Sequence, residues 1–128
     1  MSQSEHPVLV LVVDDEFLVQ HLIQDVLTDS GFAVAGADDG AEAMALLERR
    51  AAELGGLVTD VNLGPGPSGW DVAHRARELN PTLPVIYVTG DSGHEWSACG
   101  VPNSVLVHKP FAGAEIVVAL ANLRAGNR

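Results

Sequence analysis

Short apolar runs alternate five times along the chain with longer segments in which apolar residues recur every three or four positions. The runs are rich in Val and Leu, and strands this uniformly apolar are typical of a parallel sheet covered on both faces. The predicted strands are Val8–Val13, Phe32–Ala37, Gly56–Thr59, Pro84–Val88 and Ser104–His108. The pattern therefore predicts a parallel sheet between two layers of helices.

The segments that separate the strands carry helical periodicity and recognisable end signals. The predicted helices are Asp15–Ser30, Gly40–Glu53, a third capped by Ser68–Asp71 and stopped at Asn80-Pro81, Gly93–Cys99, and a fifth that begins near Pro110-Phe111 and runs through Leu120. The first is expected to bury one face, made of Leu18, Leu22, Ile23, Val26 and Leu27. The fourth is weakly specified, because it is short and contains a glycine.

Five strand–helix units in 128 residues predict one α/β domain with an open, doubly wound parallel sheet. In such sheets the functional crevice lies outside the carboxyl ends of the strands. The residues that directly follow each strand are therefore the candidates for a functional site.

Charged and hydroxyl side chains follow four of the five predicted strands. They are Asp14-Asp15-Glu16, Asp60, Thr89-Gly90-Asp91 and Lys109-Pro110. Each has an ordinary explanation when taken alone, such as a helix start, a turn or a solvated charge, but their joint occurrence favours a shared site. Three carboxylates held close together repel one another, and a hard divalent cation such as Mg²⁺ relieves that repulsion. The cluster therefore predicts a Mg²⁺ site to which a phosphoryl group would add the remaining ligands.

Lys109 strengthens this interpretation. It is the only lysine among seven basic residues, and a compact ammonium at this position is suited to contact a phosphate oxygen. Thr89 offers a hydroxyl donor to another phosphate oxygen, and Gly90 leaves the approach uncrowded.

The charge balance excludes several classes of function. Seventeen acidic residues against seven basic ones give a net charge of −10, which argues against binding to nucleic acid or to an anionic membrane. No apolar run approaches the ~20 residues of a membrane span, and the first residues lack the basic start of a signal peptide. A single cysteine, Cys99, excludes an intramolecular disulfide. We expect a cytoplasmic protein.

The motifs VVDDE, LVTDVNL, VTGD and HKPF follow one another at the ends of the predicted strands. Together they resemble the response-regulator receiver domain, the phosphoacceptor module of two-component signalling, with residues 1–128 as one domain and residues 8–125 as its core. The resemblance implies a flavodoxin-like fold, with five parallel strands in the order 2-1-3-4-5 and five helices. It also implies that Asp60 accepts a phosphoryl group from a histidine kinase or a histidine phosphotransfer protein.

The same resemblance implies a role for each residue of the cluster. The implied Mg²⁺ ligands are Asp15 and Asp60 directly, Asp14 through a water molecule, and the carbonyl of Asn62. Thr89 and Lys109 are implied to hold the phosphoryl oxygens. Such a domain catalyses the formation and hydrolysis of its own acylphosphate, so we expect no enzyme in the turnover sense. The expected assembly is a monomer or a weak homodimer with an output protein still to be identified.

Three features depart from the family pattern. Receivers usually place Tyr or Phe three residues before the strand-five lysine as a conformational switch, and this chain has Leu106 there. Tyr87 and Trp96 are nearby aromatic candidates, although Tyr87 is better explained as an ordinary strand residue. The loop after Asp60, up to Gly69, is one residue longer than usual. The weak fourth helix belongs to a face that docks partners in receivers, and it is either a mobile output element or a frayed connection.

The histidines are expected to be surface or strand residues without a functional role. The five histidines (His6, His21, His74, His94 and His108) show no metal-binding spacing, and Arg75 and Arg77 are expected to be solvated.

Competing functions remain at this point. The leading one is a stand-alone receiver that shuttles or sinks phosphoryl groups or binds a protein partner, and a receiver cut from a hybrid kinase is a variant of it. A phosphorylation-independent interaction module is the alternative that Leu106 favours. A Mg²⁺-dependent aspartyl phosphatase is less consistent with the sequence, because the second aspartate expected two residues after Asp14 is Glu16.

Overall fold

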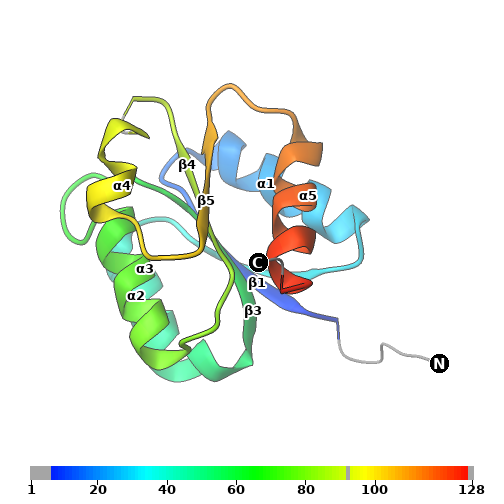
Figure 1. Cartoon of the computed structure of the whole chain (residues 1–128), viewed down its shortest axis with the longest axis horizontal. Coiled ribbons are helices and arrows are strands. Elements are labelled where there is room, and N and C mark those ends of the chain that lie inside the picture. Colours follow the sequence, from blue (N-terminus) through cyan, green and yellow to red (C-terminus); the bar gives the residue numbers. More distant parts are fainter. Residues whose placement is uncertain (1–6, 92, 127–128) are drawn as a thin grey trace.

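The computed structural model describes residues 7–91 and 93–126. Five parallel strands form one sheet in the order β2-β1-β3-β4-β5 (Figure 1). They are β1 (Leu9–Val13), β2 (Ala33–Ala37), β3 (Leu54–Asp60), β4 (Val85–Thr89) and β5 (Ser104–His108). The predicted flavodoxin-like architecture is confirmed, and each predicted strand overlaps an observed one.

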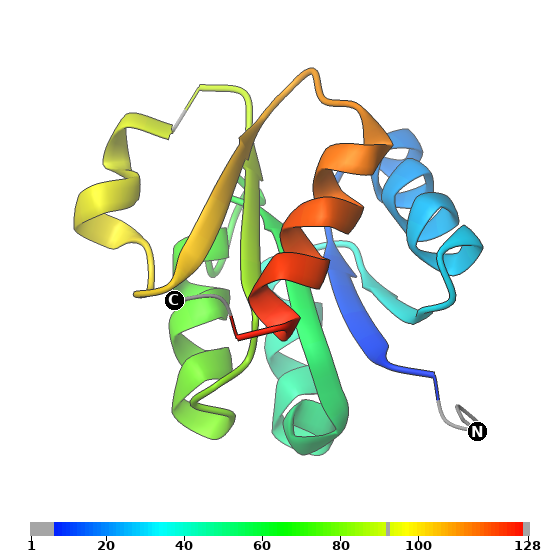
Figure 2. The ribbon, with the colours of Figure 1, turned by 45° about the vertical axis from the view of Figure 1, so that its right-hand side comes forward.

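Helices cover both faces of this sheet. They are α1 (Phe17–Asp29), α2 (Gly40–Arg50), α3 (Gly69–Leu79), α4 (Trp96–Cys99) and α5 (Gly113–Arg124), with 3₁₀ turns η1 (Ala51–Glu53) and η2 (Gly93–Glu95). Figures 1 and 2 show α1 and α5 side by side on one face, and α2, α3 and α4 on the other. None of these helices is long and apolar enough to span a bilayer.

Two apolar cores lie on opposite sides of the sheet because successive strand residues point to opposite faces. In β1, Leu11 and Val13 pack toward α2 and α3, whereas Val10 and Val12 pack toward α1 and α5. All four side chains are almost fully buried. This double coverage explains why the central strands contain apolar residues without polar alternation.

The predicted apolar face of α1 was too wide. Ile23 and Leu27 are buried as expected, but Leu18 is 79% exposed and Leu22 is 47% exposed. The buried stripe of α1 is narrow and includes a polar residue, Gln20. Helical periodicity identified the correct side of the helix, but among residues 7–91 and 93–126 no element covers Leu18, and Leu22 is only partly covered.

Several helix boundaries also differ from the prediction. The α-helical part of α2 ends at Arg50 and continues as the η1 turn, and α5 begins at Gly113, after the predicted start. The predicted fourth helix is a 3₁₀ turn followed by only four α-helical residues, consistent with its weak helical propensity.

The fourth helix is held by hydrogen bonds of its first residue, Trp96, and its last, Cys99. His74 Nε2 on α3 lies 2.8 Å from the carbonyl oxygen of Cys99, and Trp96 Nε1 donates to Ser104 Oγ at 2.9 Å. The backbone N–H of Val101 donates to the hydroxyl of Tyr87. The segment that leads from α4 into β5 is therefore attached both to α3 and to the sheet.

The prediction that Arg77 is solvated was wrong, whereas Arg75, whose side chain is 38% exposed, is solvated as expected and also forms ion pairs. Arg75 forms ion pairs with Glu48 on α2 and with Glu78 on its own helix, at 2.7 and 2.9 Å. Arg77 donates to three carbonyl oxygens, those of Leu83, Pro102 and Asn103. The guanidinium of Arg77 thus ties α3 to the loops that precede β4 and β5.

Candidate functional site

Residues at the ends of β1 and β3 form an acidic cluster at the carboxyl edge of the sheet. Asp14 and Asp15 directly follow β1, and Asp60 is the last residue of β3, which pairs with β1. Each offers a carboxylate oxygen, and the three oxygens lie within 4.8 Å of one another. Asp14 and Asp60 are buried, whereas Asp15 is exposed. The predicted convergence of these three side chains is observed.

Asp60 is fixed by contacts to both of its carboxylate oxygens. Its Oδ2 lies 3.2 Å from Lys109 Nζ, and its Oδ1 accepts a hydrogen bond from the backbone N–H of Asn62 at 3.3 Å. Burial raises the pKa of Asp60, and the neighbouring ammonium only partly opposes this. The helix α3 begins directly against the Asp60 carbonyl, at Gly69, where the backbone leaves no space for a Cβ atom.

Asp14 carries an oxygen with no hydrogen-bond donor. Its Oδ1 accepts from the backbone N–H of Glu16 at 2.8 Å. Its Oδ2 is buried and, within the described part of the chain, is the one buried side-chain polar atom without a hydrogen bond; Lys109 Nζ is 3.6 Å away. Desolvation by burial raises the pKa of Asp14 to about 6, despite that backbone hydrogen bond. An unsatisfied, buried carboxylate oxygen that faces two other carboxylates fits a cation ligand.

Lys109 follows β5 and is the cation of the cluster. Besides Asp60 and Asp14, it contacts Glu16 Oε1 at 3.1 Å. Burial by itself lowers the pKa of the ammonium, but the carboxylates outweigh this effect and raise it. One ammonium therefore contacts three carboxylates, those of Asp14, Glu16 and Asp60, and Asp15 adds a fourth to the same cluster. A divalent cation would balance the negative charge that the single ammonium leaves uncompensated.

Thr89 and Asn62 lie beside the cluster. Thr89 ends β4 and is buried; the preceding residue, Val88, pairs with Asp60, and the carbonyl of Thr89 accepts from the backbone N–H of Lys109 at 2.9 Å. Asn62 reaches the site through its backbone N–H, and its side-chain amide donates to Asp91 Oδ1 at 3.2 Å. The ligand role of the Asn62 carbonyl and the roles of Thr89 and Lys109 toward a phosphoryl group stay predictions.

Sequence reasoning placed Glu16 in the strand-end cluster without assigning it a role, and it missed Gln20. Glu16 pairs with Lys109, and its place directly after Asp15 could have suggested this. Gln20 lies buried on α1 and donates to the carbonyl oxygen of Asp14. The available signal for Gln20 was an amide on the buried stripe of a helix, three residues before Ile23.

Leu106 occupies the expected switch position on β5, opposite Tyr87 on β4. Leu106 is partly buried against the core on the α3 side of the sheet. The Tyr87 ring is fully buried, and its centroid lies 4.7 Å from that of the Trp70 ring. Its hydroxyl accepts a hydrogen bond from the backbone N–H of Val101. Tyr87 is therefore an interior strand residue, as expected.

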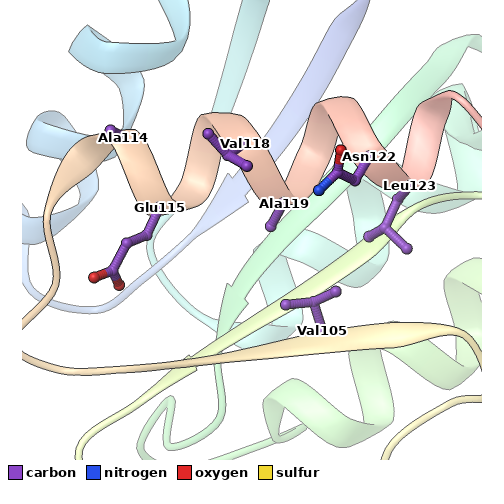
Figure 3. A pocket seen from close by; sticks show the side chains of 7 residues that line it. All are labelled: Val105, Ala114, Glu115, Val118, Ala119, Asn122 and Leu123. Atoms are coloured by element: carbon purple, nitrogen blue, oxygen red, sulfur yellow. The ribbon is translucent and has the colours of Figure 1, made fainter. Parts of the chain in front are cut away.

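An apolar groove lies between β5 and α5, apart from the acidic cluster. Its volume is about 650 Å³, and it is lined by Val105, Ala114, Glu115, Val118, Ala119, Asn122 and Leu123. Figure 3 shows Val105 pointing toward α5, with Ala119 and Leu123 pointing toward the strand. With Glu115 as its only charged lining residue, the groove suits apolar contacts rather than acid–base or metal chemistry.

Comparison with known proteins agrees with this geometry. The profile of the response regulator receiver domain matches residues 10–121. The chain is 37% identical to the probable transcriptional regulatory protein TcrX of Mycobacterium tuberculosis, over 91% of this chain and 50% of that protein. It is 33% identical to the sensor histidine kinase RcsC of Salmonella typhimurium, over 71% of this chain and 9% of the kinase. The chain thus spans about half the length of the first relative and a small part of the second.

Solved structures give the same result. A response regulator receiver protein from Sinorhizobium medicae superposes with a TM-score of 0.91 at 36% identity, covering 98% of this chain and 100% of that one. The chemotaxis response regulator CheY4 of Vibrio cholerae superposes with a TM-score of 0.77 at 27% identity, over 91% of this chain and 98% of that one. The fold, the acidic cluster and the match over residues 10–121 together show that this chain belongs to the response regulator receiver domain family.

Proposed function

We propose that this receiver domain takes a phosphoryl group from a phosphohistidine onto Asp60 and passes the signal on by protein–protein contact or by further phosphotransfer. The donor is a histidine kinase or a histidine phosphotransfer protein. The observation that carries the proposal is the contact of 3.2 Å between Asp60 Oδ2 and Lys109 Nζ beside two further carboxylates. That arrangement gives a nucleophilic oxygen and a cation for the incoming phosphoryl oxygens at the same point.

The reaction makes one bond and breaks one. A carboxylate oxygen of Asp60 attacks phosphorus in line, the P–N bond to the donor imidazole breaks, and the imidazole keeps the electron pair. Lys109, released from Asp60, pairs with a phosphoryl oxygen, and the Thr89 hydroxyl donates to another. Water later attacks phosphorus, which restores the Asp60 carboxylate and releases phosphate. The domain is modified in each cycle, and we propose no turnover of a separate substrate.

Asp14, Asp15, Asp60 and the Asn62 carbonyl are the groups proposed to hold Mg²⁺. The unsatisfied Asp14 Oδ2 and the clustered carboxylate oxygens support this assignment. When bound, Mg²⁺ neutralises the charge on the carboxylates and on the phosphoryl oxygens. The small hard cation is favoured because all of these groups offer oxygen ligands. We propose a cytoplasmic site of action, where phosphorylated kinases are available.

The second candidate is a receiver that binds its partner without phosphorylation. Leu106 favours it, because leucine cannot provide the aromatic switch of the family. The acidic cluster with Lys109 favours the phosphoacceptor instead, because burial of unsatisfied carboxylate charge is costly unless the site serves a cation or a reaction.

Intact-protein mass spectrometry after incubation with acetyl phosphate tests the proposal. We expect a single phosphoryl adduct that needs Mg²⁺ and is missing in Asp60→Asn. The matched control is Asp25→Asn, which changes an exposed aspartate on α1 and should be modified like the wild type. No adduct under conditions that modify another receiver would favour the phosphorylation-independent module, and an adduct retained in Asp60→Asn would place the reaction on another residue.

A further inference from the structure

Gln20 is a polar residue on the buried stripe of α1. Its side chain is 6% exposed, and the same stripe continues with Ile23 and Leu27, which are fully apolar. An apolar residue at this position would add to the core between α1 and the sheet. Because buried polar groups are normally hydrogen-bonded, the partners of the Gln20 amide show what it does at this position.

The amide nitrogen of Gln20 connects three segments at the carboxyl edge of the sheet. Nε2 lies 3.0 Å from the carbonyl oxygen of Asp14, 3.0 Å from that of Ala37, and 3.0 Å from Asp38 Oδ1. These acceptors belong to the ends of β1 and β2 and to the turn that leads into α2. An amide has two N–H groups, so with three acceptors at this distance both are used and at least one is shared between two oxygens.

The neighbouring residues hold the Gln20 amide in this orientation. Its Oε1 accepts a hydrogen bond from Gln24 Nε2 at 2.8 Å, one helical turn further along α1. Gly36 on β2 lies directly against this pair, and a Cβ atom there would come to 2.5 Å from Gln24 Nε2 and would also overlap Gln20 Oε1. The strand therefore has glycine at the point where the two amides approach it.

We propose that Gln20 is a positioning residue for the cation site, which fixes the backbone at Asp14 so that the carboxylates of Asp14 and Asp15 face Asp60. The inference rests on the proposed function for the identity of the cation. Carboxylates that repel one another move apart unless their backbone is held. The Gln20 amide supplies that restraint through the Asp14 carbonyl, and it links the same point to Asp38 in the next loop. Groups that orient metal ligands commonly change metal affinity about 10–100-fold when they are removed.

The test is titration calorimetry of MgCl₂ into the whole chain, in wild type and Gln20→Met. Methionine has a similar length and stays buried, but it has no donors. We expect the Kd for Mg²⁺ to rise about tenfold in Gln20→Met. Gly36→Ala perturbs the same amide from β2 and should raise the Kd several-fold. The two variants act from different elements, so the test does not depend on one of them folding.

Ile23→Val and Ile23→Ala are the matched controls, because they weaken the same buried stripe without touching the amide network. Their Kd for Mg²⁺ should stay within about twofold of the wild type, while urea denaturation reports their loss of stability. An unchanged Kd in folded Gln20→Met overturns the inference. The inference is also overturned if the Kd for Mg²⁺ rises in the Ile23 variants as much as in Gln20→Met for the same loss of stability. Gln20 would then have only a structural role. A wild type that binds no Mg²⁺ overturns the proposed cation site as well, so the two failures are distinguishable.

Discussion

Lys109 Nζ lies 3.2 Å from Asp60 Oδ2, although the two residues are 49 positions apart in the chain. Strand β4 lies between their strands: its Val88 pairs with Asp60, and its Thr89 pairs with His108, the residue before Lys109. The long side chain of Lys109 thus crosses the carboxyl end of β4 to reach the end of β3. The register of the sheet therefore places the single lysine of the sequence at the acidic cluster.

Replacing Lys109 should have opposite effects on cation binding and on phosphorylation. Lys109→Met removes a positive charge that competes with Mg²⁺ for Asp60 and Asp14, so the Mg²⁺ Kd should fall several-fold. It also removes the proposed partner of the phosphoryl oxygens, so the rate of phosphorylation by acetyl phosphate should fall at least about tenfold. Titration calorimetry and mass-spectrometric time courses measure the two effects.

The control for this variant is Arg49→Met, which removes an exposed cation from the last turn of α2. Both its Mg²⁺ Kd and its phosphorylation rate should match those of the wild type. Weaker Mg²⁺ binding in Lys109→Met would contradict the competition between the ammonium and the cation.

Mg²⁺ should stabilise the wild type more than Asp60→Asn. A ligand that binds only the folded state at about ten times its Kd adds about 1.4 kcal/mol to the free energy of unfolding, which corresponds to a rise in Tm of about 4 °C. The Asp60→Asn variant lacks one of the three clustered carboxylates, so its shift should be smaller. Thermal unfolding with and without Mg²⁺ measures both shifts, and equal shifts would count against Asp60 as a ligand.

The stability of the cation-free protein should depend on the protonation of Asp14. Burial raises its pKa from 3.8 to about 6 in the folded state, so between these pH values the folded protein binds more protons than the unfolded chain. The free energy of unfolding should therefore fall as pH rises through this window and stay lower above it. The shift corresponds to at most about 3 kcal/mol.

Asp14→Asn should reduce this pH dependence to the part that comes from Asp60, whose pKa burial also raises, because asparagine has a similar shape and no charge. Urea denaturation without divalent ions should show the variant to be more stable than the wild type at about pH 7.5, with a smaller difference at about pH 4. The same difference at both pH values would show that packing, rather than the buried charge, causes the effect.

Arg77 should contribute more to stability than Arg75. Arg77→Met loses donors to three backbone carbonyls and should lower the free energy of unfolding by about 2–4 kcal/mol. Arg75→Met loses only exposed ion pairs with Glu48 and Glu78, so its loss should be below about 1 kcal/mol. Urea denaturation of the two variants measures this order, and a larger loss for Arg75→Met would contradict the assignment of Arg77 as the tie between α3 and the following loops.

Local sequence patterns were enough to predict the strands, the order of the helices and the acidic residues at the strand ends. These features are local: apolar runs identify covered strands, caps identify helix starts, and a residue that follows a strand lies at its carboxyl end. The motif resemblance added the strand order, which the structure confirms. The proximity of Asp14, Asp15, Asp60 and Lys109 could therefore be predicted from the sequence.

The exposure of individual apolar side chains and the hydrogen-bond partners of buried polar groups depend on how the elements pack against one another. Leu18 and Leu22 have the same helical spacing as buried residues, yet both stay exposed in the described part of the chain. Gln20 and Arg77 bind carbonyl oxygens that other segments bring to them. Periodicity gives the direction in which a side chain points, but the neighbour that it meets depends on how separate segments pack in space.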